Sequence, residues 1–194
     1  MLKNLLPFFA LKRVFTTWNP ADKDSGCTLS NLNLTATQAA SNGGGVRSIA
    51  GKTNGKWYYE CSWDVASTGT TMRIGVASNL HLIGGNPGQD AESIALFADG
   101  GVVTNNASTP PNLGAITKGS IIRVGFDADT KIISFAINGA AFTTYNVSTT
   151  LTGTTLYALV GDNSSAGTKQ FTANFGATAF TYSPPTGYNS GLYT

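Results

Sequence analysis

Short runs of alternating apolar and polar residues recur along most of the chain. The clearest run, KWYYECSWDV at 56–65, places Trp57, Tyr59, Cys61 and Trp63 on one face and polar partners on the other. A period of two indicates a β-strand with one buried face. Further strands are predicted at 71–79, 93–100, 101–106, 120–128, 131–139, 155–163 and 169–177. Because no window shows an apolar stripe of period 3.6, the pattern predicts an all-β, antiparallel two-sheet β-sandwich.

Two acids interrupt the run VGFDADTKIISFAING at 124–139. Val124 and Phe126 point inward before them, and the alternation resumes at Ile133. Aspartate suits such a link because its carboxylate accepts hydrogen bonds from the backbone of a turn. We therefore expect Asp127 and Asp129 to shape a β-hairpin rather than to bind a metal. Asn138–Gly139 is a second turn signal.

The amino terminus differs from the rest of the chain. Residues 1–17 form a short apolar extension before the domain at 18–194, and residues 5–11 are too few to span a bilayer, which needs about twenty. Lys12 and Arg13 follow without the cleavage site of a secretory signal. The segment packs either on its own domain or on a partner protein, and the sequence leaves both open. The residues predicted to anchor it are Leu5, Leu6, Phe8, Phe9, Leu11 and Phe15.

Composition narrows the function classes. Charged residues make up 11% of the chain, against about 25% in typical proteins. Hydroxyl and amide groups must therefore supply most of the polar surface that contacts water. The net charge is +2 and the basic residues are scattered, which argues against nucleic-acid binding. Cys27 and Cys61 lack metal-site or redox spacing, and we expect two small buried side chains.

No catalytic constellation emerges from the motifs. His81 is the single histidine, which excludes multi-histidine metal sites, and we expect it to be exposed in a loop. Asp90, Glu92 and Asp99 lie close in sequence, yet no local pattern gives them the geometry of a glycosidase pair. The glycine-rich GGNPG at 84–88 lacks the lysine of a phosphate-binding loop. We predict no catalytic residue, no metal and no cofactor.

Five stretches, in order, resemble the SPRY (B30.2/SPRY) domain family. They are GKWYYECSW at 55–63, MRIGVAS at 72–78, GSIIRVGFDADTKIISFAINGAAF at 119–142, LYALVGDNSS at 156–165 and NFGATAFTYSPPTGY at 174–188. The resemblance covers residues 27–191 and implies a concanavalin-like jelly roll that recognises partners without catalysis. It departs from the family at 80–119, which carries no family signature, and at Thr130, where the family usually has glycine.

The resemblance implies a binding surface formed by variable loops. Three loops are candidates, at 79–89, 104–112 and 162–169, and Phe97 and Tyr145 are expected to be exposed aromatics that stack on sugars. The candidate binding residues are Asn79, His81, Asn86, Gln89, Asp90, Asn105, Asp162 and Asn163.

The low charge and the loops rich in Thr, Asn, Gly and Ser resemble SPRY-type domains carried on bacteriophage structural proteins. We therefore expect a virion surface protein, made in the host cytoplasm and attached in multiple copies to a capsid protein by its amino terminus. Its expected ligand is a host-surface glycan or a protein receptor. The alternatives are a tail-associated receptor-binding protein, a glycan-active enzyme and a cellular SPRY interaction module.

Overall fold

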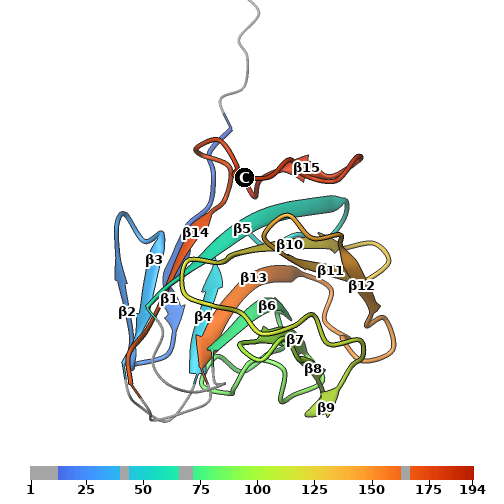
Figure 1. The fold of residues 1–194 in the computed structure, drawn as a ribbon, viewed down its shortest axis with the longest axis horizontal. Coiled ribbons are helices and arrows are strands. Elements are labelled where there is room, and N and C mark those ends of the chain that lie inside the picture. Colours follow the sequence, from blue (N-terminus) through green and yellow to red (C-terminus); the bar gives the residue numbers. More distant parts are fainter. Residues whose placement is uncertain (1–12, 40–43, 66–71, 163–166) are drawn as a thin grey trace, which may run out of the picture.

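The protein is a two-layered β-sandwich (Figure 1), seen in a computed structural model that describes residues 13–39, 44–65, 72–162 and 167–194. Within these ranges every regular element is a strand. The strands are β1 Trp18–Lys23, β2 Cys27–Ser30, β3 Thr35–Gln38, β4 Gly44–Ser48, β5 Lys56–Val65, β6 Met72–Ser78, β7 Ser93–Phe97, β8 Val102–Thr104, β9 Ala107–Ser108, β10 Ile121–Asp127, β11 Ile132–Ile137, β12 Thr143–Asn146, β13 Leu156–Asp162, β14 Lys169–Asn174 and β15 Asn189–Ser190. The predicted all-β class is confirmed.

The strands form two sheets that face each other. The seven-stranded sheet has the order β1-β4-β13-β6-β7-β8-β9, and the eight-stranded sheet has the order β12-β11-β10-β5-β14-β3-β2, with β15 beside β5. All pairings are antiparallel except β15 with β5. Long β5 lies at the centre of its sheet, between β10 and β14, so its two faces decide both the core and the outer surface.

The core lies between the sheets and is rich in aromatic and aliphatic side chains. Trp57, Tyr59, Cys61 and Trp63 all face it, as the alternation in β5 predicts. The Tyr59 hydroxyl donates a 2.6 Å hydrogen bond to the carbonyl of Gly75 in the opposite sheet, so this buried polar atom is satisfied. Burial raises the pKa of Tyr59 well above its usual range. Cys27 and Cys61 are buried, which confirms that expectation, and both are free thiols, which the sequence did not decide.

The hairpin between β10 and β11 follows its sequence signals. Asp127 Oδ1 accepts the backbone amides of Asp129 at 3.0 Å and Thr130 at 3.2 Å. Asp129 Oδ2 accepts the amide of Gly55 at 2.8 Å, which ties the hairpin to the start of β5. The left-handed position falls at Lys131, with φ of 55°, so Thr130 does not need the conformational freedom of glycine. The two acids therefore shape a turn, as predicted.

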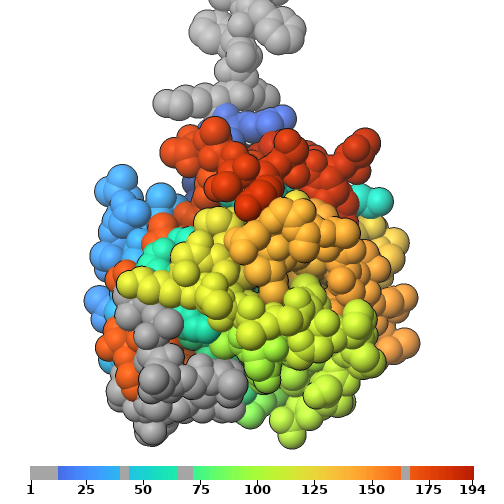
Figure 2. Space-filling model, in the orientation of Figure 1, coloured from blue at the N-terminus to red at the C-terminus, as the bar shows by residue number. Residues whose placement is uncertain are grey.

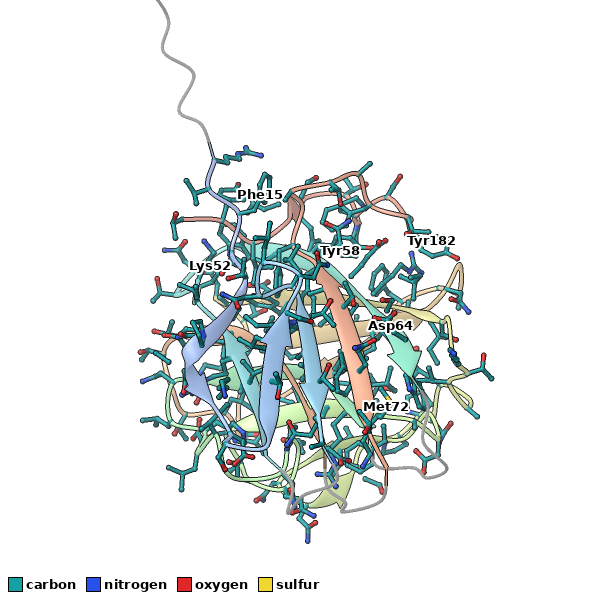
Figure 3. The ribbon with its side chains drawn as sticks, turned by 90° about the vertical axis from the view of Figure 1, so that its left-hand side faces the viewer. Phe15, Lys52, Tyr58, Asp64, Met72 and Tyr182 are labelled. Atoms are coloured by element: carbon teal, nitrogen blue, oxygen red, sulfur yellow. The ribbon has the colours of Figure 1, made fainter. Side chains whose placement is uncertain are left out.

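Part of the outer face of the eight-stranded sheet is covered. This differs from the expectation that β5 has only one buried face. Tyr58 and Glu60 point away from the core, yet they are 0% and 3% exposed. Residues 176–188, which we call the C-terminal segment, cover them: the ring of Phe180 packs edge-on against Tyr58 with centroids 4.8 Å apart. Figure 3 shows Tyr182 of this segment near Tyr58. Strand alternation marks the two faces but does not reveal what covers them.

Both ends of the described chain meet at one end of the sandwich (Figures 1 and 2). Phe15 forms a β-bridge with Tyr193, and their rings pack edge-on at 5.8 Å. The Thr16 amide donates to Leu192 O at 2.9 Å, and Thr16 Oγ1 accepts the amide of Ala50 at 2.8 Å. Residues 13–17 therefore pack on the domain itself. Phe15, one of the predicted anchoring residues, thus packs on Tyr193 of its own domain. The other five, Leu5, Leu6, Phe8, Phe9 and Leu11, lie outside the described residues, and an anchoring role for the segment stays a prediction.

A buried ion pair joins the two sheets. Asp162 at the end of β13 and Lys169 at the start of β14 are both 0% exposed, and Asp162 Oδ2 lies 2.5 Å from Lys169 Nζ. Arg73 of β6 is also buried, and its Nη1 donates a 2.6 Å hydrogen bond to Pro87 O. Burial lowers the pKa of Arg73 to about 10, while the charge of Asp162 opposes that shift. Within the described ranges, no helix has the length and apolarity to cross a membrane.

We predict that Asp162→Asn destabilises the protein by about 3–5 kcal/mol, because it leaves the Lys169 ammonium buried without its carboxylate. Chemical denaturation measures the free energy of unfolding. The matched control is Lys56→Ala, which breaks a 3.9 Å contact with Asp127 in which the lysine side chain is 50% exposed. That change should cost less than about 1 kcal/mol. Equal losses in the two variants would contradict a structural role for the buried pair.

Candidate binding site

The loop at 79–92, between β6 and β7, contains most of the predicted binding residues. Asn79 Oδ1 accepts the amides of Thr154 at 3.0 Å and Thr155 at 3.2 Å. Asn86 Nδ2 donates to Gln89 Oε1 at 2.7 Å. These amide side chains hold the loop together and fasten it to the segment before β13. The structure thus brings the loop residues into one cluster, but it uses their polar groups within the protein.

His81 is buried, so the expectation of an exposed histidine is wrong. Its residue exposure is 2%, and Nδ1 lies 2.5 Å from Asp90 Oδ2. Asp90 Oδ1 also accepts the hydroxyl of Ser93 at 2.6 Å and the amide of Glu92 at 3.2 Å. Partial burial by itself would raise the pKa of Asp90, but the bonds from His81 and Ser93 outweigh it and hold the pKa below its ordinary value. The contact between His81 and Asp90 thus joins two positions within the 79–92 loop.

Glu92 attaches the same loop to the turn before β13. Its Oε2 accepts the Ser78 hydroxyl at 2.5 Å and the Gly153 amide at 3.0 Å, and Oε1 accepts the Thr152 amide at 3.1 Å. Desolvation opposes these contacts, yet they keep the pKa of Glu92 below its ordinary value. From its position in the sequence, Glu92 was a candidate only for a catalytic acid. The structure gives it a structural role.

The remaining predicted residues are scattered. Asn105 is exposed in the turn between β8 and β9, with φ of 50°. Asp162 is buried in its ion pair and is not a loop residue, while Asn163 lies outside the described residues. Tyr145 is 3% exposed and donates its hydroxyl to Pro111 O at 2.7 Å, so it offers no exposed ring. Phe97 is half-buried, with the Arg73 guanidinium 4.1 Å above its ring. Neither aromatic is the exposed platform that was expected.

A groove of about 350 Å³ opens instead on the outer face of the eight-stranded sheet. It lies over β10, β5 and β14, with the β2–β3 turn and the C-terminal segment among its walls. We call it the outer-face groove, and its lining residues are Asn31, Leu34, Glu60, Ser62, Ile121, Thr172, Ala173, Asn174, Thr178 and Thr181. None of them was among the residues predicted to bind a ligand.

Hydroxyl groups on the groove floor are held by a neighbouring carboxylate on the same sheet face. Ser62 Oγ donates to Asp64 Oδ1 at 2.6 Å, and Thr172 Oγ1 donates to Asp64 Oδ2. Thr35 and Thr172 share a hydroxyl contact of 2.9 Å. Because the Thr172 hydrogen is directed to Asp64, Thr35 is the donor in that contact. Asp64 therefore orients two neighbouring hydroxyl groups on adjacent strands.

Glu60 fixes the wall formed by the C-terminal segment. Its Oε2 accepts the amide of Thr181 at 2.8 Å, and its Oε1 accepts the amide of Tyr182 at 2.7 Å and the hydroxyl of Tyr58 at 2.9 Å. Asn174 supports the same wall, since its Nδ2 donates to Ala179 O at 3.0 Å. The alternation of β5 placed Glu60 and Ser62 on the outer face. It carried no signal that residues 176–188 return across that face.

Charges near the groove are mostly covered. Arg123, opposite Glu60 in the sheet, lies between the rings of Phe142 and Tyr182, with its guanidinium carbon 4.5 Å and 5.0 Å from their centroids. The lining contains no lysine or arginine. A search of the described residues finds no group of three or more His, Cys, Asp or Glu side chains suited to a metal ion. The arrangement suits non-covalent binding of an uncharged polar ligand.

Comparison with known proteins identifies the fold. The family model of the SPRY domain matches residues 56–178. The crystal structure of the SPRY domain of human HERC1 superposes with a TM-score of 0.70 at 19% identity, covering 80% of this chain and 96% of that one. The crystal structure of the TRIM65 PSpry domain superposes with a TM-score of 0.63 at 14% identity, covering 83% of this chain and 92% of that one. The stonustoxin structure superposes with a TM-score of 0.60 at 17% identity, covering 83% of this chain and 27% of that one. No curated protein matches the sequence.

We predict that the 79–92 loop loosens in acid. The carboxylates of Asp90 and Glu92 have lowered pKa values in the folded protein. Their contribution to the stability of the loop is therefore complete above the ordinary pKa values of 3.8 and 4.5, and it is lost as the pH falls through the lower pKa values of the folded state. Hydrogen exchange of the Thr152 and Gly153 amides, measured from pH 7 down to pH 3 after correction for intrinsic rates, should show protection falling below about pH 4.

Glu92→Gln should weaken this protection already at pH 7. Asp99→Asn is the matched control, because exposed Asp99 accepts only a local turn amide, that of Gly101, at 2.9 Å. Unchanged protection in Glu92→Gln at neutral pH would show that the carboxylate does not hold the loop.

Proposed function

Since this chain belongs to the SPRY domain family, we propose that it is a non-catalytic recognition module on the surface of a bacteriophage particle. SPRY domains are generally interaction modules without catalytic activity. In this proposal the amino-terminal residues attach the protein to a capsid protein, and the sandwich is displayed outward. The ligand is a molecule of the host surface, either a glycan or a protein receptor.

The observation that carries the recognition role is the contrast between the loop acids and the groove. Asp90 and Glu92, with His81, are committed to hydrogen bonds that hold a loop. The outer-face groove, by comparison, presents hydroxyl and amide side chains around a solvent-open hollow. Catalysis by acids and bases needs groups that can reach a substrate. Binding needs only complementary shape and hydrogen-bonding groups.

Display in many copies is part of the same proposal. A shallow site binds weakly, but an assembly that presents it repeatedly gains avidity without any new contact. The apolar residues Leu5, Leu6, Phe8, Phe9 and Leu11 are the proposed attachment, because a run of this kind is expected to bury itself against a partner. A tail-associated receptor-binding protein would use the same two parts, and locating the protein on the particle distinguishes capsid from tail.

We predict that deleting residues 1–12 leaves a folded domain that no longer joins the virion. Thermal unfolding of the purified variant checks the fold, and immunoblotting of purified particles, with immunogold labelling of the parent, checks incorporation and position. The expected outcome is an unchanged melting temperature and loss from the particle. Normal incorporation of the shortened chain would refute attachment through this segment.

Deleting residues 1–17 is the structural comparison. It also removes the Thr16 contacts with Ala50 and Leu192 and the Phe15 bridge to Tyr193. We expect this longer deletion to lower the melting temperature, whereas the shorter one does not. Equal melting temperatures for the two deletion variants would contradict a structural role for residues 13–17 and would group them with residues 1–12.

A further inference from the structure

We propose that the outer-face groove binds neutral saccharide chains, and that its walls and floor, rather than the predicted loops, hold the ligand. This inference rests on the proposed recognition function and specifies its ligand. What the groove can bind depends on which of its hydrogen-bonding atoms are not already used within the protein.

The floor offers hydrogen-bond acceptors. Each hydroxyl carries one hydrogen. Those of Ser62 and Thr172 both point to Asp64. Both residues line the groove. The Ser62 oxygen retains lone pairs for a ligand, and the Thr172 oxygen retains one besides the pair that accepts the Thr35 hydroxyl. A ligand must therefore bring donors to this floor, and the hydroxyl groups of a sugar do so.

The charge of the groove argues against anionic ligands. Glu60 lines it and Asp64 lies beside the floor hydroxyls on the same outer face, while the nearest strand-paired cation, Arg123, is covered by Phe142 and Tyr182. A phosphate, sulfate or carboxylate would meet acceptor oxygens and two carboxylates with no lining lysine or arginine. Like charges in such a partly buried site repel. Neutral sugars avoid this cost.

The position of the groove argues against an extended peptide. Polypeptides that add a strand to a sheet need an unpaired strand edge. The groove instead crosses the face of β10, β5 and β14, and β5 pairs on both sides, with β10 and with β14. Only side chains remain available there. Leu34 and Ile121, both partly buried, give small apolar surfaces between the polar groups, which suits the C–H faces of a sugar ring.

The walls supply adaptable partners. Thr178 and Thr181 on the C-terminal segment and Asn31 on the β2–β3 turn are exposed and can donate or accept hydrogen bonds. Among the described residues, no aromatic side chain lines the groove, so each site should bind weakly. Repeated display on a particle would compensate for that weakness.

The test uses the 194-residue chain immobilised in many copies on fluorescent beads. The beads are applied to an array of neutral hexose and N-acetylhexosamine oligosaccharides and of their sialylated and sulfated counterparts. The site variant is Thr178→Val with Thr181→Val, which removes two exposed hydroxyls at nearly constant volume. The control is Thr28→Val with Thr144→Val, two exposed threonines on β2 and β12 outside the groove lining.

We expect the parent and the control to bind neutral chains in preference to anionic ones. The site variant should lose about tenfold or more in affinity, as expected for two hydrogen bonds of about 1 kcal/mol each. Equal melting temperatures for parent, control and site variant would show that the fold is intact. Asp64→Asn should raise the binding of sialylated chains relative to neutral chains, because one repelling charge is removed.

Other results would overturn the inference. Undiminished glycan binding by the site variant would place the ligand elsewhere on the protein. A preference of the parent for anionic chains would refute the donor and charge argument. Absence of any glycan binding, or capture only of a peptide from a parallel peptide array, would refute the ligand class. The proposed function is judged separately, because incorporation into particles does not depend on the groove.

Discussion

The buried carboxylate of Glu60 attaches the C-terminal segment to the outer face of the eight-stranded sheet. It accepts two consecutive backbone amides, those of Thr181 and Tyr182, together with the hydroxyl of Tyr58. Hydrogen bonds to a charged group contribute about 1.5–3 kcal/mol each, so this single side chain can determine the path of the segment. The cover over Tyr58, the shielding of Arg123 and one wall of the outer-face groove all follow from that path.

Polar side chains serve different purposes in two parts of the molecule. In the 79–92 loop, Asn79, Asp90 and Glu92 replace missing secondary structure, because their oxygens accept backbone and hydroxyl hydrogens that would otherwise be unsatisfied. In the groove, Asp64 orients hydroxyls whose oxygens still face solvent. A protein with few charges can use the same residue types for structure and for recognition, and only the hydrogen-bond partners distinguish the two.

The family provides the scaffold but not the ligand. At 14–19% identity, the solved SPRY structures share the sandwich with this chain, and that degree of similarity establishes the fold alone. The groove depends on side chains such as Ser62, Thr172 and Thr181. For this reason its ligand has to be derived from this chain's own hydrogen bonds and charges. In the proposed arrangement, recognition at the sheet face is separate from the end of the sandwich where Phe15 meets Tyr193, which is the end proposed for attachment.

By itself the sequence determined the strands, the inner face of β5 and the hairpin at Asp127 and Asp129, because period-two burial and turn hydrogen bonds act over a few residues. The burial of Tyr58, Glu60, His81 and Asp162 was decided only by the tertiary structure. Each of these side chains is covered or paired by a residue from another element, such as Phe180 over Tyr58 or Lys169 beside Asp162. The outer-face groove belongs to the same class, since its floor and walls come from strands and turns that lie far apart in the chain. Local alternation tells which way a side chain points, while its accessibility depends on what the rest of the chain places over it.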